Sequence, residues 1–352
     1  MGIQPDSAGK AARIAEGEGK PVASPRAGRW FRAVILRPET GGAISALAVF
    51  LFFAILAGSS GFLTTLGTAD WLDTASELGI IAIPVGMLMT AGEFDLSVGS
   101  VVGAGSMVLA IISGYYSLNP WIGVMAAVLV GALIGLINGL LVVTTRLPSF
   151  IVTLAMMLMV MGGMLAIAIV LTGSTSLSAS SAGSAGIIFA AKWHQFQSSI
   201  LIWLVLLVIA TYVMQRTAFG NWIYATGGDE NRARLAGVPT ARVKIILFVC
   251  TSVGATLTGI IETMSFQNGN VTLGASYVFT GIAAAVIGGV LLGGGYGSPI
   301  GTMFGTLTYG IVSLGVFFLG WNADLTQLFI GLLLLLAVLA NHRLRMAAMG
   351  RV

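Results

Sequence analysis

The stretch that decides the fold runs from residue 91 to residue 103 and reads Ala-Gly-Glu-Phe-Asp-Leu-Ser-Val-Gly-Ser-Val-Val-Gly. It places two carboxylates, Glu93 and Asp95, between the apolar runs 78–90 and 101–112. A carboxylate at the centre of a membrane helix costs roughly 2.5–3.5 kcal/mol on insertion scales, so acids are rare there. We therefore expect either a solute pathway at this point or a helix start that is buried within protein.

The composition shows what surrounds this stretch. Hydrophobic residues make up 57% of the 352 residues, and charged residues make up only 9%. A water-soluble domain carries about 25% charged residues because its surface must be solvated. The outer surface of this chain must therefore face lipid. The single cysteine excludes an internal disulfide framework, and the net charge of +4 does not indicate nucleic-acid binding, because the basic residues fall between apolar spans.

Apolar segments of membrane length predict an all-α polytopic membrane protein with about ten transmembrane helices, since one span needs about 20 apolar residues. Some spans, including those around Ser97 and residues 293–299, are expected to be broken or short, and a turn at 293–298 fits better than a continuous helix through Pro299. Glycines at every fourth position, as in residues 131–139, predict close helix packing. The predicted spans are residues 42–63, 72–90, 97–115, 121–143, 150–171, 200–214, 243–263, 277–292, 299–319 and 325–340.

The distribution of basic residues orients these spans, because loops rich in Lys and Arg stay in the cytoplasm. With ten spans, both termini and the loop at 216–244 are predicted to be cytoplasmic. Residues 1–40 are predicted to be a largely disordered basic tail, residues 41–341 a single transmembrane domain, and residues 342–352 a second cytoplasmic tail.

Two interpretations of the acidic pair remain open. Asp95 suits the cap of the following helix, where its carboxylate would accept from free amides near Ser97 and Val98. Alternatively, Glu93 and Asp95 line a translocation path, because polar residues at broken helices mark substrate routes in transporters. We favour capping for Asp95 and weigh the two roles of Glu93 equally; both roles can hold together.

The loop at 216–244 contains a short predicted helix at residues 229–238. Asp229 or its neighbour starts this helix, and Gly237 followed by a proline ends it. A solvated connector is one explanation. However, Leu235 and Val238 give the helix an apolar patch that would suit docking against a soluble partner, and we favour docking.

Several catalytic signatures are absent from the sequence. It contains no Gly-x-x-x-x-Gly-Lys-Ser/Thr phosphate loop, no Gly-x-Ser-x-Gly elbow and no His-Glu-x-x-His motif. We therefore predict a protein that is not itself an enzyme and that holds no cofactor. If nucleotide hydrolysis drives its activity, another subunit must supply it.

Residues 92–100, Gly-Glu-Phe-Asp-Leu-Ser-Val-Gly-Ser, resemble the Gly-Gly-Ile-Asp-Leu-Ser-Val-Gly signature of the ribose-type sugar permeases of bacterial ABC importers. Three further segments resemble that family in the same order, namely residues 146–154, 220–244 and 283–301. The resemblance covers roughly residues 78–340.

This resemblance implies a multi-pass permease subunit of the bacterial inner membrane that imports a monosaccharide, either a pentose or a hexose. It implies a second permease chain, identical or different, and cytoplasmic ABC ATPase subunits that bind the ATP. A periplasmic or lipid-anchored sugar-binding protein would deliver the substrate.

The resemblance also assigns roles to residues. Contacts that couple the chain to the ATPase would come from Asp229, Glu230, Asn231, Arg232, Arg234, Leu235 and Gly237. The translocation path or structural signature would involve Glu93, Asp95, Ser97, Gly99, Phe150 and Thr153. Glu93 and Phe94 replace a Gly and an Ile of the family signature, which leaves the particular sugar open. Arg234 stands where the family loop is more often apolar or small.

The alternative is an ion-coupled secondary transporter of a small polar solute that uses Glu93 and Asp95. Such a carrier would move solute alone, without ATP, and would not need the docking helix at 229–238. A membrane-embedded enzyme is disfavoured, because no convergent nucleophile, base or metal ligands are present.

Overall fold

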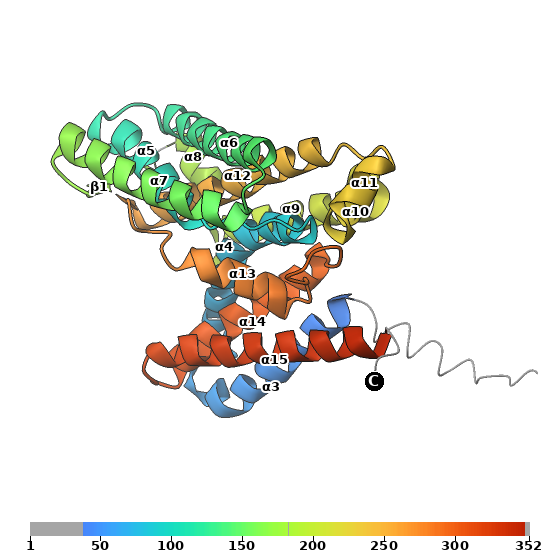
Figure 1. The fold of residues 1–352 in the computed structure, drawn as a ribbon. Coiled ribbons are helices and arrows are strands. Elements are labelled where there is room, and N and C mark those ends of the chain that lie inside the picture. The colour runs from blue at the N-terminus through green and yellow to red at the C-terminus, as the bar shows by residue number, and fades with distance from the viewer. Residues whose placement is uncertain (1–37, 182, 349–352) are drawn as a thin grey trace, which may run out of the picture. The chain divides into compact units, whose positions relative to one another are not determined.

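The computed structural model describes residues 38–181 and 183–348, and within them the chain is an all-α membrane protein (Figure 1). In the part of the chain that the structure describes, eight helices are long and apolar enough to cross a membrane, and two shorter apolar helices accompany them. The long helices are α3 Pro38–Ala57, α4 Thr65–Thr90, α5 Val98–Ala110, α6 Pro120–Thr145, α7 Ser149–Thr172, α9 Ser198–Arg216, α12 Thr240–Phe266 and α14 Pro299–Phe318. The shorter apolar stretches are α13 Tyr277–Ile287 and the first part of α15 Asp324–Ala348.

These helices lie at the ten predicted positions, and the predicted irregularities have identifiable causes. A π-helical turn, η2 Ile111–Tyr115, completes the third span. The eighth span is short, because α13 ends at Ile287 and the chain then turns through residues 288–298. Helix α4 begins at Thr65 rather than at residue 72, since the Thr64 hydroxyl accepts from the Gly67 amide and caps it.

The interior of the protein is formed by α4, α5 and α12. Their most apolar windows are 67–78% buried, whereas that of α7 is only 17% buried. Helix α12 packs against α4, α5 and α6, and α14 packs against α3 and α4. The predicted glycine seam of α6 lies in the contact with α12: a Cβ at Gly135 would come within 2.5 Å of the Phe248 carbonyl oxygen. Helices α3, α14 and α15 lie side by side (Figure 1).

The connections contain elements that the sequence did not predict. Strand β1 Ser176–Ser178 pairs in antiparallel register with β4 Asn268–Asn270. Helix α8 Gly183–Phe189 and the short hairpin of β2 Lys192–Trp193 and β3 Phe196–Gln197 follow β1 in the chain and precede α9.

Two helices extend across the predicted domain boundaries at the ends of the described chain. The tail predicted for residues 1–40 lies outside the described residues, except for residues 38–40, which begin α3. At the other end, α15 continues to Ala348, past the predicted boundary at residue 341. The loop predicted at 216–244 contains helix α10 Ala218–Gly228, helix α11 Glu230–Leu235 and the start of α12.

Candidate functional site

The connection between α4 and α5, residues 91–97, is here called the signature loop, and Asp95 lies at its centre. The Asp95 side chain is fully buried. Its Oδ1 accepts from the Ser97 amide at 2.9 Å and from the Ser97 hydroxyl at 2.6 Å, and its Oδ2 accepts from the Thr251 hydroxyl of α12 at 3.0 Å. Both carboxylate oxygens are therefore engaged. The hydrogen bond from the Ser97 amide lies in the turn before α5, and the N-cap residue of α5 is Ser97 itself.

Besides Thr251 of α12, side chains of α6 and α7 hold the signature loop in place. The Asn138 amide of α6 is fully buried and donates to the Ser97 hydroxyl at 2.8 Å. On α7, the Ser149 hydroxyl accepts from the Phe94 amide at 3.0 Å, and the Thr153 hydroxyl accepts from the Leu96 amide at 3.1 Å. These bonds satisfy backbone donors that have no partner in a membrane interior unless protein supplies one.

Two other predicted residues lie at the edge of this arrangement. Gly99, in the first turn of α5, packs so closely on a neighbouring loop that a Cβ would approach the Gly274 carbonyl oxygen within 2.5 Å. Phe150 is on α7, but its side chain is 53% exposed. Gly99 therefore allows close packing of α5 on that loop. Phe150 does not belong to the buried polar residues around Asp95.

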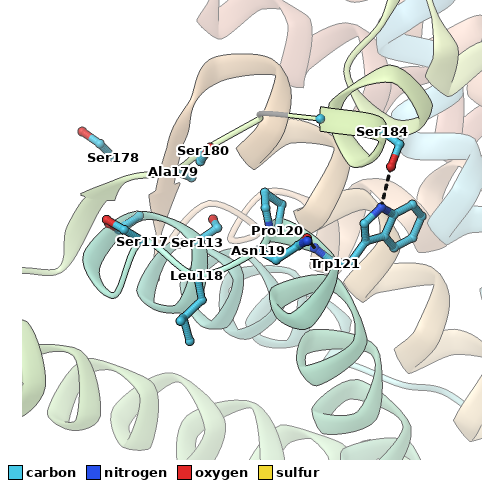
Figure 2. Close-up of a pocket in the computed structure, with 12 residues that line it drawn as sticks. Ser113, Ser117, Leu118, Asn119, Pro120, Trp121, Ser178, Ala179, Ser180 and Ser184 are labelled. Carbon is cyan, nitrogen blue, oxygen red and sulfur yellow. Dashed lines mark hydrogen bonds between the residues drawn. The ribbon is translucent and has the colours of Figure 1, made fainter.

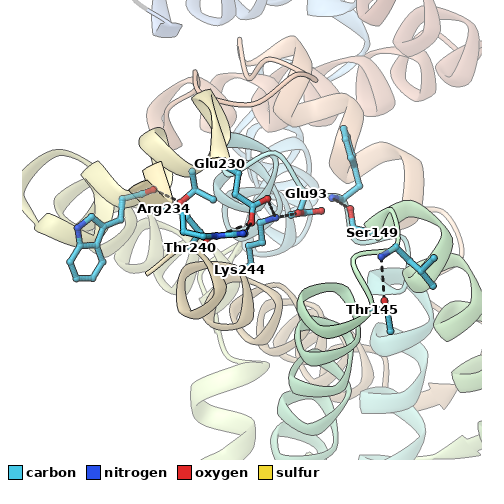
Figure 3. Close-up of polar contacts among 11 residues, drawn as sticks. Glu93, Thr145, Ser149, Glu230, Arg234, Thr240 and Lys244 are labelled. Carbon is cyan, nitrogen blue, oxygen red and sulfur yellow. Dashed lines mark hydrogen bonds and ion pairs between the residues drawn. The ribbon is translucent and has the colours of Figure 1, made fainter. Parts of the chain in front are cut away.

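The second carboxylate of the loop, Glu93, belongs to an ion-pair cluster. The Lys244 ammonium lies 2.5 Å from Glu93 Oε1 and 2.6 Å from Glu230 Oε2, and Figure 3 shows it between the two carboxylates. Glu93 is in the signature loop, Lys244 near the start of α12, and Glu230 is the first residue of α11. One buried cation thus joins the two segments that the sequence singled out separately.

Helix α11 has the local structure that the sequence predicted. Asp229 caps it through a bond from the Arg232 amide to Oδ1 at 3.0 Å, and Gly237 follows it with φ of +83°. Arg234 donates to Glu230 Oε1 at 2.6 Å. Burial raises the pKa of Glu230, but hydrogen bonds and charges from Lys244 and Arg234 outweigh it, so the pKa is lowered from its ordinary value. Glu230 is therefore charged at neutral pH.

Most residues of α11 and of the turn after it are exposed on the surface of the described chain. Leu235 is 89% exposed, and Asn231, Arg232, Arg234 and Gly237 are exposed as well. The Arg232 guanidinium pairs with Asp229 at 3.0 Å, but such surface pairs contribute little stability. A single exposed Leu is common on protein surfaces, so Leu235 does not by itself identify a docking contact.

Three backbone segments meet beside the ion-pair cluster, namely the end of α4, the end of α10 and the turn at 288–298. The Gly295 amide donates to the Thr90 carbonyl at 2.8 Å. A Cβ at Gly227 would lie 1.9 Å from that same Thr90 oxygen and 2.6 Å from the Gly295 nitrogen. In addition, the Tyr224 hydroxyl donates to the Gly297 carbonyl at 2.9 Å. Glycine is therefore required at residue 227, because any side chain would push the three segments apart.

Two pockets lie at opposite ends of α6. One, of about 550 Å³, borders the ion-pair cluster and includes Glu93, Arg146, Arg234 and Lys244. The other, of about 630 Å³, lies between the end of the third span, the start of α6 and the β1–α8 connection (Figure 2). Its lining is rich in serine, and the Trp121 indole donates to the Ser184 hydroxyl at 2.9 Å.

Most of the predicted site residues therefore belong either to the buried polar network around Asp95 or to helix α11, and Lys244 connects the two through its ion pairs with Glu93 and Glu230. Asp95, Ser97 and Thr153 share the buried polar network, while Asp229, Glu230 and Arg234 lie on or beside α11. Lys244 was missed as a site residue, because a lysine near the end of an apolar span can also reach the membrane interface without a partner. Thr251 and Gly227 were also missed, and neither carries a distinctive sequence signal.

The comparisons with known proteins identify the family of the chain. Residues 67–338 match the model of the family described as branched-chain amino acid transport system / permease component. The chain belongs to this family. The match includes every residue of the signature loop, the ion-pair cluster and α11.

Curated relatives of this family member include sugar permeases. The chain is 30% identical to the ribose import permease protein RbsC of Escherichia coli strain K12 over 306 residues, or 85% of this chain and 93% of that protein. It is 33% identical to the fructose import permease protein FrcC of Rhizobium meliloti over 315 residues, or 87% and 85%. The Bacillus subtilis ribose import permease is 29% identical over 80% and 86%. No solved structure matches the chain. The protein is thus a sugar-type ABC permease of the bacterial inner membrane.

Proposed function

We propose that this chain is the transmembrane subunit of an ABC importer that moves a monosaccharide, a pentose or a hexose, into the cytoplasm. The ribose and fructose permeases among its relatives support this substrate class. Helix α11 is the coupling helix, and a cytoplasmic ATPase subunit binds and hydrolyses the ATP. A second permease chain and a sugar-binding protein on the outer side complete the importer.

The observation that carries this proposal is the structure of α11. Its residue Leu235 is 89% exposed, and its residue Glu230 is attached to α12 by the ion pair with Lys244 at 2.6 Å. A helix with one exposed side and one side attached to the membrane domain can transmit a movement of a bound soluble subunit to that domain. The coupling helix of an importer must do this at each ATP cycle.

The contacts of the two loop carboxylates disfavour the ion-coupled alternative. Glu93 is paired with Lys244, and Asp95 accepts three hydrogen bonds, from Ser97 and Thr251. A carboxylate that binds a transported ion must be able to exchange its partners during each cycle. Both acids here have partners supplied by the chain itself, as structural acids do.

The proposal is tested by truncating the exposed contact of α11. Leu235→Ala should weaken binding of the ATPase subunit roughly 10- to 100-fold, since a buried Leu contributes about 1.5–3 kcal/mol. The matched control is Ile55→Ala, because Ile55 on α3 is also apolar and 81% exposed. Binding is measured with the purified ATPase on nanodiscs, and uptake with labelled ribose and fructose in cells.

Two outcomes would contradict the proposal. Wild-type protein that binds no ATPase would overturn the importer assignment. Equal losses in Leu235→Ala and Ile55→Ala would remove α11 as the coupling helix.

A further inference from the structure

The ion-pair cluster joins the signature loop to helix α11. Lys244 Nζ lies 2.5 Å from Glu93 in the signature loop and 2.6 Å from Glu230 in α11. The other oxygen of Glu230 accepts from Arg234 of the same short helix. The Glu230 carboxylate therefore binds Arg234 of its own helix and Lys244 of α12, and Lys244 also binds Glu93 of the signature loop (Figure 3).

Burial makes this link persistent. The side chains of Lys244 and Glu93 are only 9% and 12% exposed, whereas that of Glu230 is 35% exposed. Ion pairs shielded from water are screened much less by salt than surface pairs are. Separating Lys244 from either partner would leave a poorly solvated charge, which is strongly unfavourable. The three groups should therefore move together when one of them is displaced.

The loop end of the link is connected to the interior of the membrane domain. The residue after Glu93, Phe94, donates its amide to Ser149 at the start of α7, and Leu96 donates to Thr153 one turn later. Between them, Asp95 accepts from Thr251 of α12. A displacement of Glu93 therefore reaches the starts of α5 and α7 through consecutive residues of one loop.

We propose that Lys244 is the positioning residue that transmits the movement of the coupling helix α11 to the signature loop through the Glu230–Lys244–Glu93 ion pairs. This inference rests on the proposed function of α11. It assigns to Glu93, which replaces a glycine of the family signature, the task of receiving the movement rather than contacting the solute.

A simpler role for Lys244 would be to anchor the cytoplasmic end of α12 as a positive charge. Arg242 separates the two roles, because it lies two positions earlier on the same helix and is exposed. If charge at the end of α12 were sufficient, removal of either cation would have a similar effect. If pairing matters, only the loss of Lys244 will disturb the signature loop.

The test is hydrogen exchange measured by mass spectrometry on the purified complex of this chain with its ATPase subunit. Exchange is compared without nucleotide and after incubation with ATP and vanadate, which traps ADP and vanadate in the ATPase after hydrolysis, so no knowledge of the transported sugar is needed. The amides of Phe94 and Leu96 are informative, because each is held by a hydroxyl of α7 and exchanges when the loop opens. The variants are Lys244→Met, Lys244→Arg and Arg242→Met.

In the wild type we expect nucleotide to change exchange both in α11 and at residues 92–97. Lys244→Met should keep the change in α11 and lose it at residues 92–97. Lys244→Arg, which retains a cation able to reach both carboxylates, should restore it, and Arg242→Met should match the wild type. If Lys244→Met does not purify as a folded complex, Glu93→Gln provides the same comparison, because it removes one charge of the link and leaves Lys244 in place.

The link is overturned if Lys244→Met still shows the nucleotide-dependent change at residues 92–97, or if Arg242→Met loses it equally. A wild-type complex whose α11 does not respond to nucleotide would instead overturn the coupling assignment, and the link with it. The response of α11 thus distinguishes failure of the proposed function from failure of the link.

Discussion

Asp95 illustrates how much a single residue organises at the start of α5. Its carboxylate accepts from one backbone amide and two hydroxyls, and it is fully buried. In a membrane interior, no water replaces a partner that is removed. The consequence for folding is therefore larger than for a cap on the surface of a soluble protein.

Asp95→Ala should destabilise the protein by about 2–5 kcal/mol, because each buried donor left without a partner costs about 1–3 kcal/mol. Asp95→Asn should be much milder, since its oxygen can still accept from Ser97 and its amide can donate to the Thr251 hydroxyl. Thermal unfolding in detergent measures both. An alanine variant as stable as the wild type would show that the three hydrogen bonds to Asp95 do not stabilise the fold.

Thr153 offers a second test at this scale. Thr153→Val should cost about 1–3 kcal/mol, because the Leu96 amide loses its acceptor in a buried site. The matched control is Thr144→Val on α6, where the hydroxyl is exposed and donates to Leu140 of its own helix. The same unfolding assay applies, and equal stability of the two variants would contradict this account.

At the scale of elements, the decisive contact is the junction of α4, α10 and the turn at 288–298. Its closeness depends on Gly227, whose absent side chain leaves room for the Thr90 carbonyl. The next residue, Gly228, has open space where a Cβ would be. A side chain is therefore excluded at residue 227 but has room at residue 228.

Gly227→Ala should displace α10 from α4 and reduce both stability and uptake, while Gly228→Ala should behave as the wild type. We expect a loss of about 1–3 kcal/mol for Gly227→Ala, the usual cost of overpacking. Unfolding in detergent and sugar uptake in cells measure the pair. Indistinguishable variants would show that the three segments do not meet as described.

The attachment of α11 should also depend on pH in a defined direction. Because the pKa of Glu230 is lowered below its ordinary value of 4.5, its ion pairs stabilise the folded state above that value and are lost as pH falls through the lowered pKa. The mobility of a spin label at residue 231, in a Cys250→Ser background, should stay constant from pH 8 down to about pH 5. Release of the label near neutral pH would contradict the ion-pair geometry.

At the scale of the whole molecule, the sequence predicted the helices better than their contacts. Runs such as residues 121–143 are long and uniformly apolar, so lipid solvation alone identifies them. The pairing of Lys244 with Glu93 could not be predicted, because it depends on how α12 packs beside the signature loop. The β1–β4 pair was missed for the same reason, since three-residue strands carry no periodicity.

In the candidate site too, local features could be predicted from the sequence, and contacts between distant segments could not. The Asp229 cap and the Gly237 stop of α11 are local, and both could be read from adjacent residues. The hydroxyl of Thr251 and the absent side chain of Gly227 act on segments far away in the chain. Such contacts become visible only when the helices are assembled.

The central claim is that this membrane domain works with a separate ATPase, and purification from native membranes tests it most directly. The chain is isolated in mild detergent, and the proteins that accompany it are identified by mass spectrometry. We predict an ATPase with a Gly-x-x-x-x-Gly-Lys-Ser/Thr sequence whose recovery falls with Leu235→Ala and not with Ile55→Ala. Recovery of the chain alone, under conditions that keep a known importer intact, would contradict the account and favour an ion-coupled carrier.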